Sequence, residues 1–227
     1  MKKNRMLKAA LGLGAAMSLW LGLSAYGAQS SVIESVNVSF KTVYGEPEEI
    51  PEPEVTVSGK SCSLGDVQYR TDYDSWKPGR KVRVEVTVVA EDGKYFPATL
   101  NRSKCKVTGA DFVSAKALDD SSLQVKADYR PVTVLGDTQK AGWSSTSKKK
   151  AVWKSVEYAP GYTLTLYGDN KVVKRITVES NSVNLADYMT DMDKTYYYEV
   201  KAVPVTSDEK KYLKEGQYVT STDQEFD

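Results

Sequence analysis

The chain has 227 residues, enough for one large domain or two small ones, with two cysteines and no histidine. The missing histidine excludes Ser-His-Asp triads, Cys-His dyads and histidine-based zinc sites, and two cysteines are too few for a four-cysteine metal site. Four of the 31 basic residues and none of the 30 acidic residues fall within residues 1–27, so the rest carries a net charge of −3. That charge gives no general attraction to nucleic acid or anionic lipid.

The first 27 residues have the three-part plan of a secretory signal peptide. A basic start at residues 2–8 is followed by 15 uncharged, mostly apolar residues at 9–23. Ala25 and Gly27 then stand at positions −3 and −1 of a cut before Ala28. A membrane-spanning helix needs about 20 apolar residues, so we expect cleavage and secretion. An uncleaved N-terminal anchor is the alternative.

The chain after this segment follows a β-strand pattern. Through residues 81–89, valines at every second position alternate with charged and polar residues, which is typical of a strand with one buried and one wet face. Pro, Gly, Asp and Asn cluster between such runs, where the chain must turn. Short strands at this spacing predict an all-β sandwich or barrel. We expect strands near residues 32–40, 81–89, 123–129, 162–167 and 196–203.

Two domains fit this pattern better than one. We predict two tandem antiparallel β-sandwiches after the signal peptide, at residues 28–135 and 141–227, each close to the roughly 100 residues of an immunoglobulin-type domain. Residues 135–140 are interpreted as a short linker between them. Residues 46–54 are rich in Pro and Glu, and we expect them to run extended along a sheet edge, where Pro blocks edge pairing.

Three motifs follow one another within residues 141–220. They are an Ala-Val-Trp run ending at Trp153, a strand opening with Gly-Tyr at Tyr162, and Tyr, Tyr, Val and Ala at alternate positions from Tyr196. In this order the motifs resemble a fibronectin type III domain of the kind found in surface proteins of Gram-positive bacteria. The resemblance implies that Trp153 lies on an early core strand and that Tyr196 is the corner tyrosine of the penultimate strand.

The first half carries a looser set of features. Tyr73 and Trp76 precede a Pro-Gly turn, the valine-rich strand at 81–89 follows, and an Ala-Glu-Asp-Gly turn leads to Tyr95 and Phe96. This half is similar to an Ig-like companion domain in secreted Gram-positive proteins that carry cell-wall-binding repeats. The repeats themselves, which are rich in Trp-Tyr and Gly, do not occur in this chain.

Two pairs of residues are the candidate site residues. Cys62 and Cys105 form an even pair in an exported protein, which predicts a disulfide, with two buried free thiols as the alternative. Tyr73 and Trp76 could present their rings to a sugar or peptide, with packing in the core as the alternative.

We assign no catalytic, cofactor-binding or metal-binding residue. Asp119 and Asp120 are an example of neighbouring carboxylates that could flank a glycosidic bond, but adjacency in a loop does not establish the required separation. Asp187, Asp191 and Asp193 could bind calcium, yet they lack the glycine and closing glutamate of an EF-hand loop. We interpret both groups as solvated turns.

These observations predict a non-catalytic secreted or cell-surface module that acts as a spacer or in adhesion and binding. Its partner would be a cell-wall polymer, a glycan or a surface protein. The alternative is an accessory domain of a cell-wall-acting hydrolase system. We expect a monomer, secreted or associated with the cell wall, with no cofactor and with no nucleic-acid or membrane partner once the signal peptide is removed.

Overall fold

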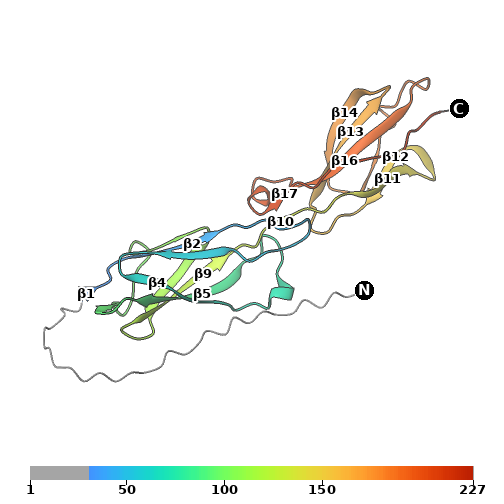
Figure 1. Ribbon diagram of the computed structural model, residues 1–227. Helices are drawn as coiled ribbons and strands as arrows, with labels where there is room; N and C mark the ends of the chain where they lie inside the picture. The colour runs from blue at the N-terminus through green and yellow to red at the C-terminus, as the bar shows by residue number, and fades with distance from the viewer. Residues whose placement is uncertain (1–30, 227) are drawn as a thin grey trace, which may run out of the picture.

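The computed structural model describes residues 31–226, which form an all-β protein of the β-sandwich class (Figure 1). The helices of this part are two short 3-10 turns, Tyr73–Ser75 and Glu209–Lys211. Across residues 31–226 no helix is both long and apolar enough to cross a membrane. The predicted signal peptide, residues 1–27, lies outside the described residues.

Two sheets enclose one hydrophobic core in the N-terminal half, residues 31–130. The first sheet has the order β3-β2-β7, with bounds Glu54–Ser58, Val36–Lys41 and Cys105–Thr108. The second has the order β4-β5-β9-β8, with bounds Cys62–Tyr69, Val82–Ala90, Ser122–Tyr129 and Asp111–Ala117. A short parallel pair, β1 (Ser31–Val32) with β6 (Lys94–Tyr95), lies at the end far from the C-terminal half (Figure 1).

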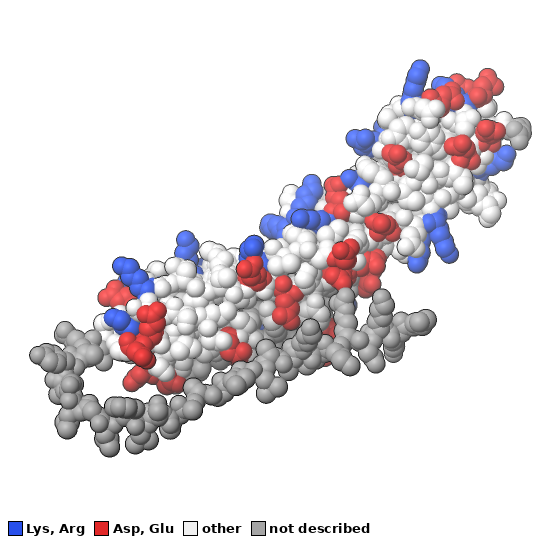
Figure 2. Space-filling model, viewed as in Figure 1, with Lys and Arg blue, Asp and Glu red and all other residues white. Residues whose placement is uncertain are grey.

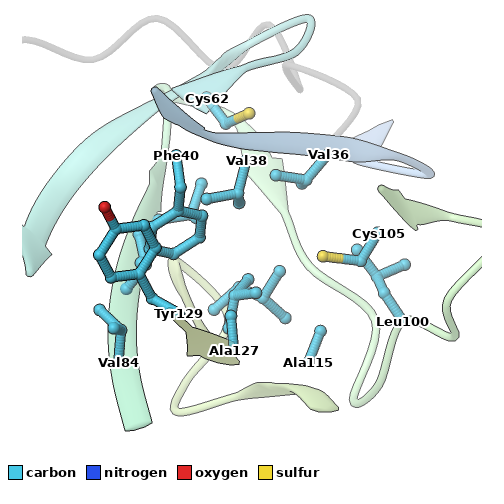
Figure 3. Packing of buried hydrophobic residues seen from close by; sticks show 14 of the residues in the cluster. Val36, Val38, Phe40, Cys62, Val84, Leu100, Cys105, Ala115, Ala127 and Tyr129 are labelled. Carbon is cyan, nitrogen blue, oxygen red and sulfur yellow. The ribbon is translucent and has the colours of Figure 1, made fainter. Parts of the chain in front are cut away.

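Strand β5 shows why these residues form a sandwich. Its predicted alternation is confirmed, because Val82, Val84, Val86 and Val88 are at most 2% exposed. Across the core, Val36, Val38 and Phe40 of β2 face Val84, Ala127 and Tyr129 of the second sheet (Figure 3). The rings of Phe40 and Tyr129 stack with centroids 6.1 Å apart. Burial of these apolar side chains is the main stabilising contribution to this half.

The C-terminal half, residues 131–226, has a second core of its own between two further sheets. The first sheet has the order β11-β12-β15, with bounds Gln139–Ser144, Ser147–Lys154 and Ser182–Asn184. The second has the order β14-β13-β16-β18, with bounds Lys171–Val178, Gly161–Gly168, Tyr196–Val203 and Val219–Thr220. Trp153 is 4% exposed, with its ring 6.1 Å from that of Tyr198, so its predicted place in the core is confirmed.

Tyr198 joins the two sheets of this half. Its fully buried hydroxyl accepts a hydrogen bond from the Gly142 N–H at 2.7 Å. The same hydroxyl lies 2.6 Å from the Gly142 carbonyl oxygen and 2.7 Å from that of Val152, and these oxygens share its single proton. One side chain of β16 therefore satisfies backbone groups of both β11 and β12.

Replacing Tyr198 by Phe tests this link. Tyr198→Phe keeps the ring but leaves buried backbone groups without a partner, so we expect a loss of about 1–3 kcal/mol in the free energy of unfolding. Urea unfolding followed by tryptophan fluorescence measures it. Tyr197→Phe, on the outward face of the same strand, is the matched control, and we expect it to change stability by under about 0.5 kcal/mol. Equal effects of the two substitutions on the free energy of unfolding would contradict the role of the Tyr198 hydroxyl in joining the two sheets.

The outward face of β5 carries a carboxylate that is largely covered by cations. Glu85 is 6% exposed, and its carboxylate oxygens lie 2.5 Å from Arg70 Nη2 and 2.9 Å from Lys126 Nζ. Gln124 also donates to it at 3.1 Å. The hydrogen bonds from Arg70 and then Lys126 lower the pKa of Glu85 from 4.5 to about 2. The ionised form is therefore favoured in the folded state.

This pKa shift predicts a pH-dependent contribution to stability. The ionised Glu85 stabilises the fold above about pH 4.5, and this contribution is lost as the pH falls toward 2, where the folded protein also takes up the proton. Because Arg70 is half exposed and screened by solvent, we expect Glu85→Gln to cost about 1–2 kcal/mol at neutral pH. Urea midpoints measured from pH 7 down to pH 2 should show the difference shrinking with acidity. A difference independent of pH would rule out this role.

Candidate functional site

Two of the acidic residues named in the sequence analysis, Asp119 and Asp191, have carboxylates that are bonded within turns. Among residues 31–226, no group of three or more His, Cys, Asp or Glu residues is arranged to hold a metal ion. The Asp191 carboxylate lies 3.2 Å from Lys194 Nζ and accepts the Asp193 N–H at 3.1 Å. Asp119 accepts both the N–H and the hydroxyl of Ser121 at 2.8 Å, which fixes a hairpin turn. These carboxylates are engaged in turns.

Tyr73 and Trp76, the predicted ligand contacts, lie in different environments. Trp76 is 4% exposed, donates its indole N–H to the Thr71 carbonyl at 3.2 Å, and packs edge-on against the Tyr69 ring at 4.9 Å. Tyr73 is 46% exposed, and its hydroxyl donates to the Ile50 carbonyl. Trp76 is therefore a core side chain that cannot present its ring face to a ligand. The two rings lie in contact, with centroids 5.0 Å apart, but only the Tyr73 ring is open to solvent.

The predicted disulfide between Cys62 and Cys105 is absent, because both cysteines are free and buried. They belong to different sheets: Cys62 begins β4, and Cys105 begins β7. Val36 is the direct strand neighbour of Cys105, and its side chain lies between the two sulfur atoms in Figure 3. The Cys62 sulfur instead packs against Gly59, where an added Cβ would lie 2.8 Å away. An even count of cysteines predicted a bond that the packing does not make.

Both thiols should therefore react slowly in the folded protein and fully after unfolding. Burial raises the pKa of both, to about 11 for Cys105, so the reactive thiolate is scarce at neutral pH. Labelling with a disulfide reagent in guanidinium, without reductant, should give two thiols per chain. A reduced sample run in parallel is the control. Finding no free thiol before reduction would show that the two cysteines form a disulfide after all.

A junction of short strands connects the two halves, and it is the most specific arrangement outside the cores. It consists of residues 44–49, residues 131–138 with β10 (Thr133–Val134), and residues 208–217 with β17 (Leu213–Lys214). On the side of the N-terminal half, Val134 forms a parallel bridge with Pro47 and accepts the Glu48 N–H at 2.8 Å. The Thr133 hydroxyl donates to the Glu49 carbonyl at 2.5 Å.

The opposite edge of the same strand pairs with the C-terminal half. Strands β10 and β17 are parallel, and the N–H groups of Thr133 and Leu135 donate to the carbonyls of Tyr212 and Lys214, both at 3.0 Å. Because successive residues of a strand direct their backbone groups to opposite edges, β10 can pair on both sides at once. The connection between the halves is therefore bonded to β17 on one edge and to the isolated bridge at Pro47 on the other.

Direct contacts between the halves surround this strand. An added Cβ on Gly79, whose φ is +73°, would lie 2.6 Å from the Tyr212 ring, so the backbone of one half touches an aromatic ring of the other. Lys214 Nζ lies 3.5 Å from the centroid of the Tyr44 ring. These contacts fix the approach of the two halves around β10.

The expected short linker, residues 135–140, begins directly after this strand and is exposed in part, at Asp137, Gln139 and Lys140. Val132, Thr133, Leu135 and Thr138 are at most 3% exposed. Linkers between independent domains are usually exposed and crossed by few contacts, whereas residues 132–135, which lead into the expected linker, are largely buried and hydrogen-bonded on both edges. Leu135 packs in the core of the C-terminal half, so the expected linker is buried where it begins.

The sequence matches no protein-family model and no curated protein at a significant level. The candidate site is therefore defined by its own geometry.

Proposed function

We propose that this protein is a non-catalytic extracellular spacer whose two β-sandwich domains are held in a fixed relative orientation. The observation that carries the proposal is β10, the connecting strand that is bonded to residues 47–49 on one edge, through its backbone and the Thr133 hydroxyl, and to β17 on the other. A connection that is hydrogen-bonded on both edges resists bending, because any rotation of one half must break pairs made by the other.

The placement of the chain ends supports this function. Strand β1 lies at one end of the elongated molecule and the C-terminal residues lie near the other (Figure 1). A segment attached at either position would be separated from the other by the length of both sandwiches. On the visible face, Lys and Arg are interspersed with Asp and Glu along both halves, without a large field of one sign (Figure 2). Such a mixed surface suits a spacer without a general attraction to polyions.

The resemblances named above enter as part of the proposal. The C-terminal half has seven strands in sheets of three and four, which supports a fibronectin type III-like domain. The Tyr196 hydroxyl accepts the Asp191 N–H at 3.3 Å, five residues upstream, as expected of a corner tyrosine. The seven main strands of the N-terminal half likewise support an Ig-like domain. The signal-peptide pattern supports secretion, with a cell-wall polymer, glycan or surface protein as the proposed partner.

Two glycine substitutions with the same backbone cost test the fixed orientation. Gly79 and Gly93 have φ values of +73° and +72°, so alanine at either position carries a strain of about 1 kcal/mol. Only at Gly79 would the new Cβ meet the Tyr212 ring, because nothing lies within 4 Å of the Cβ position at Gly93. We expect Gly79→Ala to loosen the junction and Gly93→Ala to leave it intact.

NMR relaxation of backbone amides measures the outcome. In the wild-type protein and in Gly93→Ala, both halves should share one rotational correlation time, and residues 131–138 should resist protease. In Gly79→Ala the two halves should tumble more independently, and cleavage between 131 and 138 should be faster. Independent tumbling of the halves in the wild-type protein would refute the spacer proposal.

A further inference from the structure

A pocket of about 300 Å³ lies in the N-terminal half, where the chain enters β5. Its lining contains no Asp or Glu residue. Three cationic side chains and two hydroxyl side chains line it instead: Lys77, Arg80, Lys81, Thr71 and Ser75. We call it the 71–81 pocket. Ammonium, guanidinium and hydroxyl groups are the side-chain groups that bind an anion.

Two of the three cations are not neutralised by the rest of the described chain. Lys81 Nζ lies 2.8 Å from the Asp111 carboxylate. Lys77 and Arg80 are exposed and form no ion pair with any residue from 31 to 226. The two acidic residues of the preceding loop, Asp72 and Asp74, do not line the pocket. Two cations without an ion-pair partner therefore lie at its wall, although residues 28–227 as a whole are slightly acidic.

The backbone that carries these cations is fixed before any ligand arrives. Trp76 is a lining residue whose side chain is buried, and its indole N–H is bonded to the Thr71 carbonyl at 3.2 Å, which joins the two ends of the loop. The Arg80 N–H donates to the Lys77 carbonyl at 3.1 Å across the turn, and the Gly79 N–H donates to the Pro131 carbonyl at 2.9 Å. Binding would order only the ends of two long side chains, which limits its entropic cost.

We propose that the 71–81 pocket binds a phosphate group, either as free phosphate or as one unit of a phosphodiester polymer. A guanidinium presents several N–H donors in a planar fork that matches phosphate oxygens, and an ammonium adds a point charge beside it. Hydroxyl side chains supply further hydrogen bonds. The pocket volume leaves room for the carbon groups on either side of a phosphodiester. This site gives the molecule a binding activity that its role as a spacer does not require.

The test is a titration of the mature protein at low ionic strength with three probes. These are inorganic phosphate, a short poly(glycerol phosphate) and a polyglutamate of matched length. Backbone amide shifts should change at residues 71–82 with the phosphate probes, and affinity should fall as salt is added. Shifts with both phosphate probes assign the site to the phosphate group alone, and shifts with the polymer only assign it to a phosphodiester chain. Equal binding of polyglutamate would overturn the preference for phosphate.

Paired substitutions locate the site. Lys77→Gln with Arg80→Gln removes the two unpaired cations and should weaken binding at least about tenfold. Lys106→Gln with Lys116→Gln is the matched control, since both lysines are exposed in the same half and outside the pocket, and it removes the same charge. All four side chains are exposed, so folding is preserved. Unchanged affinity in the first variant, equal losses in both, or no binding of any phosphate probe by the wild-type protein would each overturn the proposal.

Discussion

The alternation of backbone groups along β10 is the constraint on which the arrangement of this protein depends. In a strand, neighbouring residues present their N–H and C=O groups to opposite edges. The N–H groups of Thr133 and Leu135 bond to the C-terminal half, while the Val134 carbonyl accepts a bond from Glu48 of the N-terminal half. A segment of three residues, 133–135, thus joins two hydrophobic cores that share no buried residue.

The cores themselves are regular sandwiches, and the junction depends on their strand ends. Gly79 lies in the turn that leads into β5, and residues 131–132 continue directly from the end of β9, so the N-terminal core positions the segments that meet Tyr212. In the C-terminal half, β17 follows β16 after a single 3-10 turn. Packing within each half therefore determines the geometry of the contact between them. A change in either core that shifts these ends will be transmitted to the junction.

The strands could be predicted from sequence, and the junction could not. The alternation of valines with polar residues from Val82 to Val88 is a local signal for a strand, and the same residues form β5 in the folded protein. The partners of Thr133 lie about 80 residues away in each direction, at Glu49 and Tyr212, and no local pattern records such pairing. Residues 135–140 contain a glycine and polar residues, a composition that predicts a short linker, although Leu135 is fully buried.

The cysteines, the two aromatic residues and the cations of the pocket show the same limit, because distance and orientation are not recorded in a local sequence pattern. The count of two cysteines carries no information on distance, and the packing of Val36 beside Cys105 decided against a bond. The spacing of Tyr73 and Trp76 does not tell which ring faces the core. The cations of the 71–81 pocket stand beside these aromatic residues in sequence, but only the folded arrangement shows that they line one pocket and that no carboxylate lines it.

The shared pairing of β10 has a consequence for anyone who divides this protein into recombinant fragments. Neither half contains the complete junction, so a fragment that ends before β10 leaves residues 47–49 with unpaired backbone groups, and one that begins after it exposes an edge of β17. Open strand edges promote self-association. A fragment boundary placed in the expected linker, residues 135–140, would therefore produce domains that self-associate. Retaining residues 131–138 in both fragments would give each half its own copy of the strand.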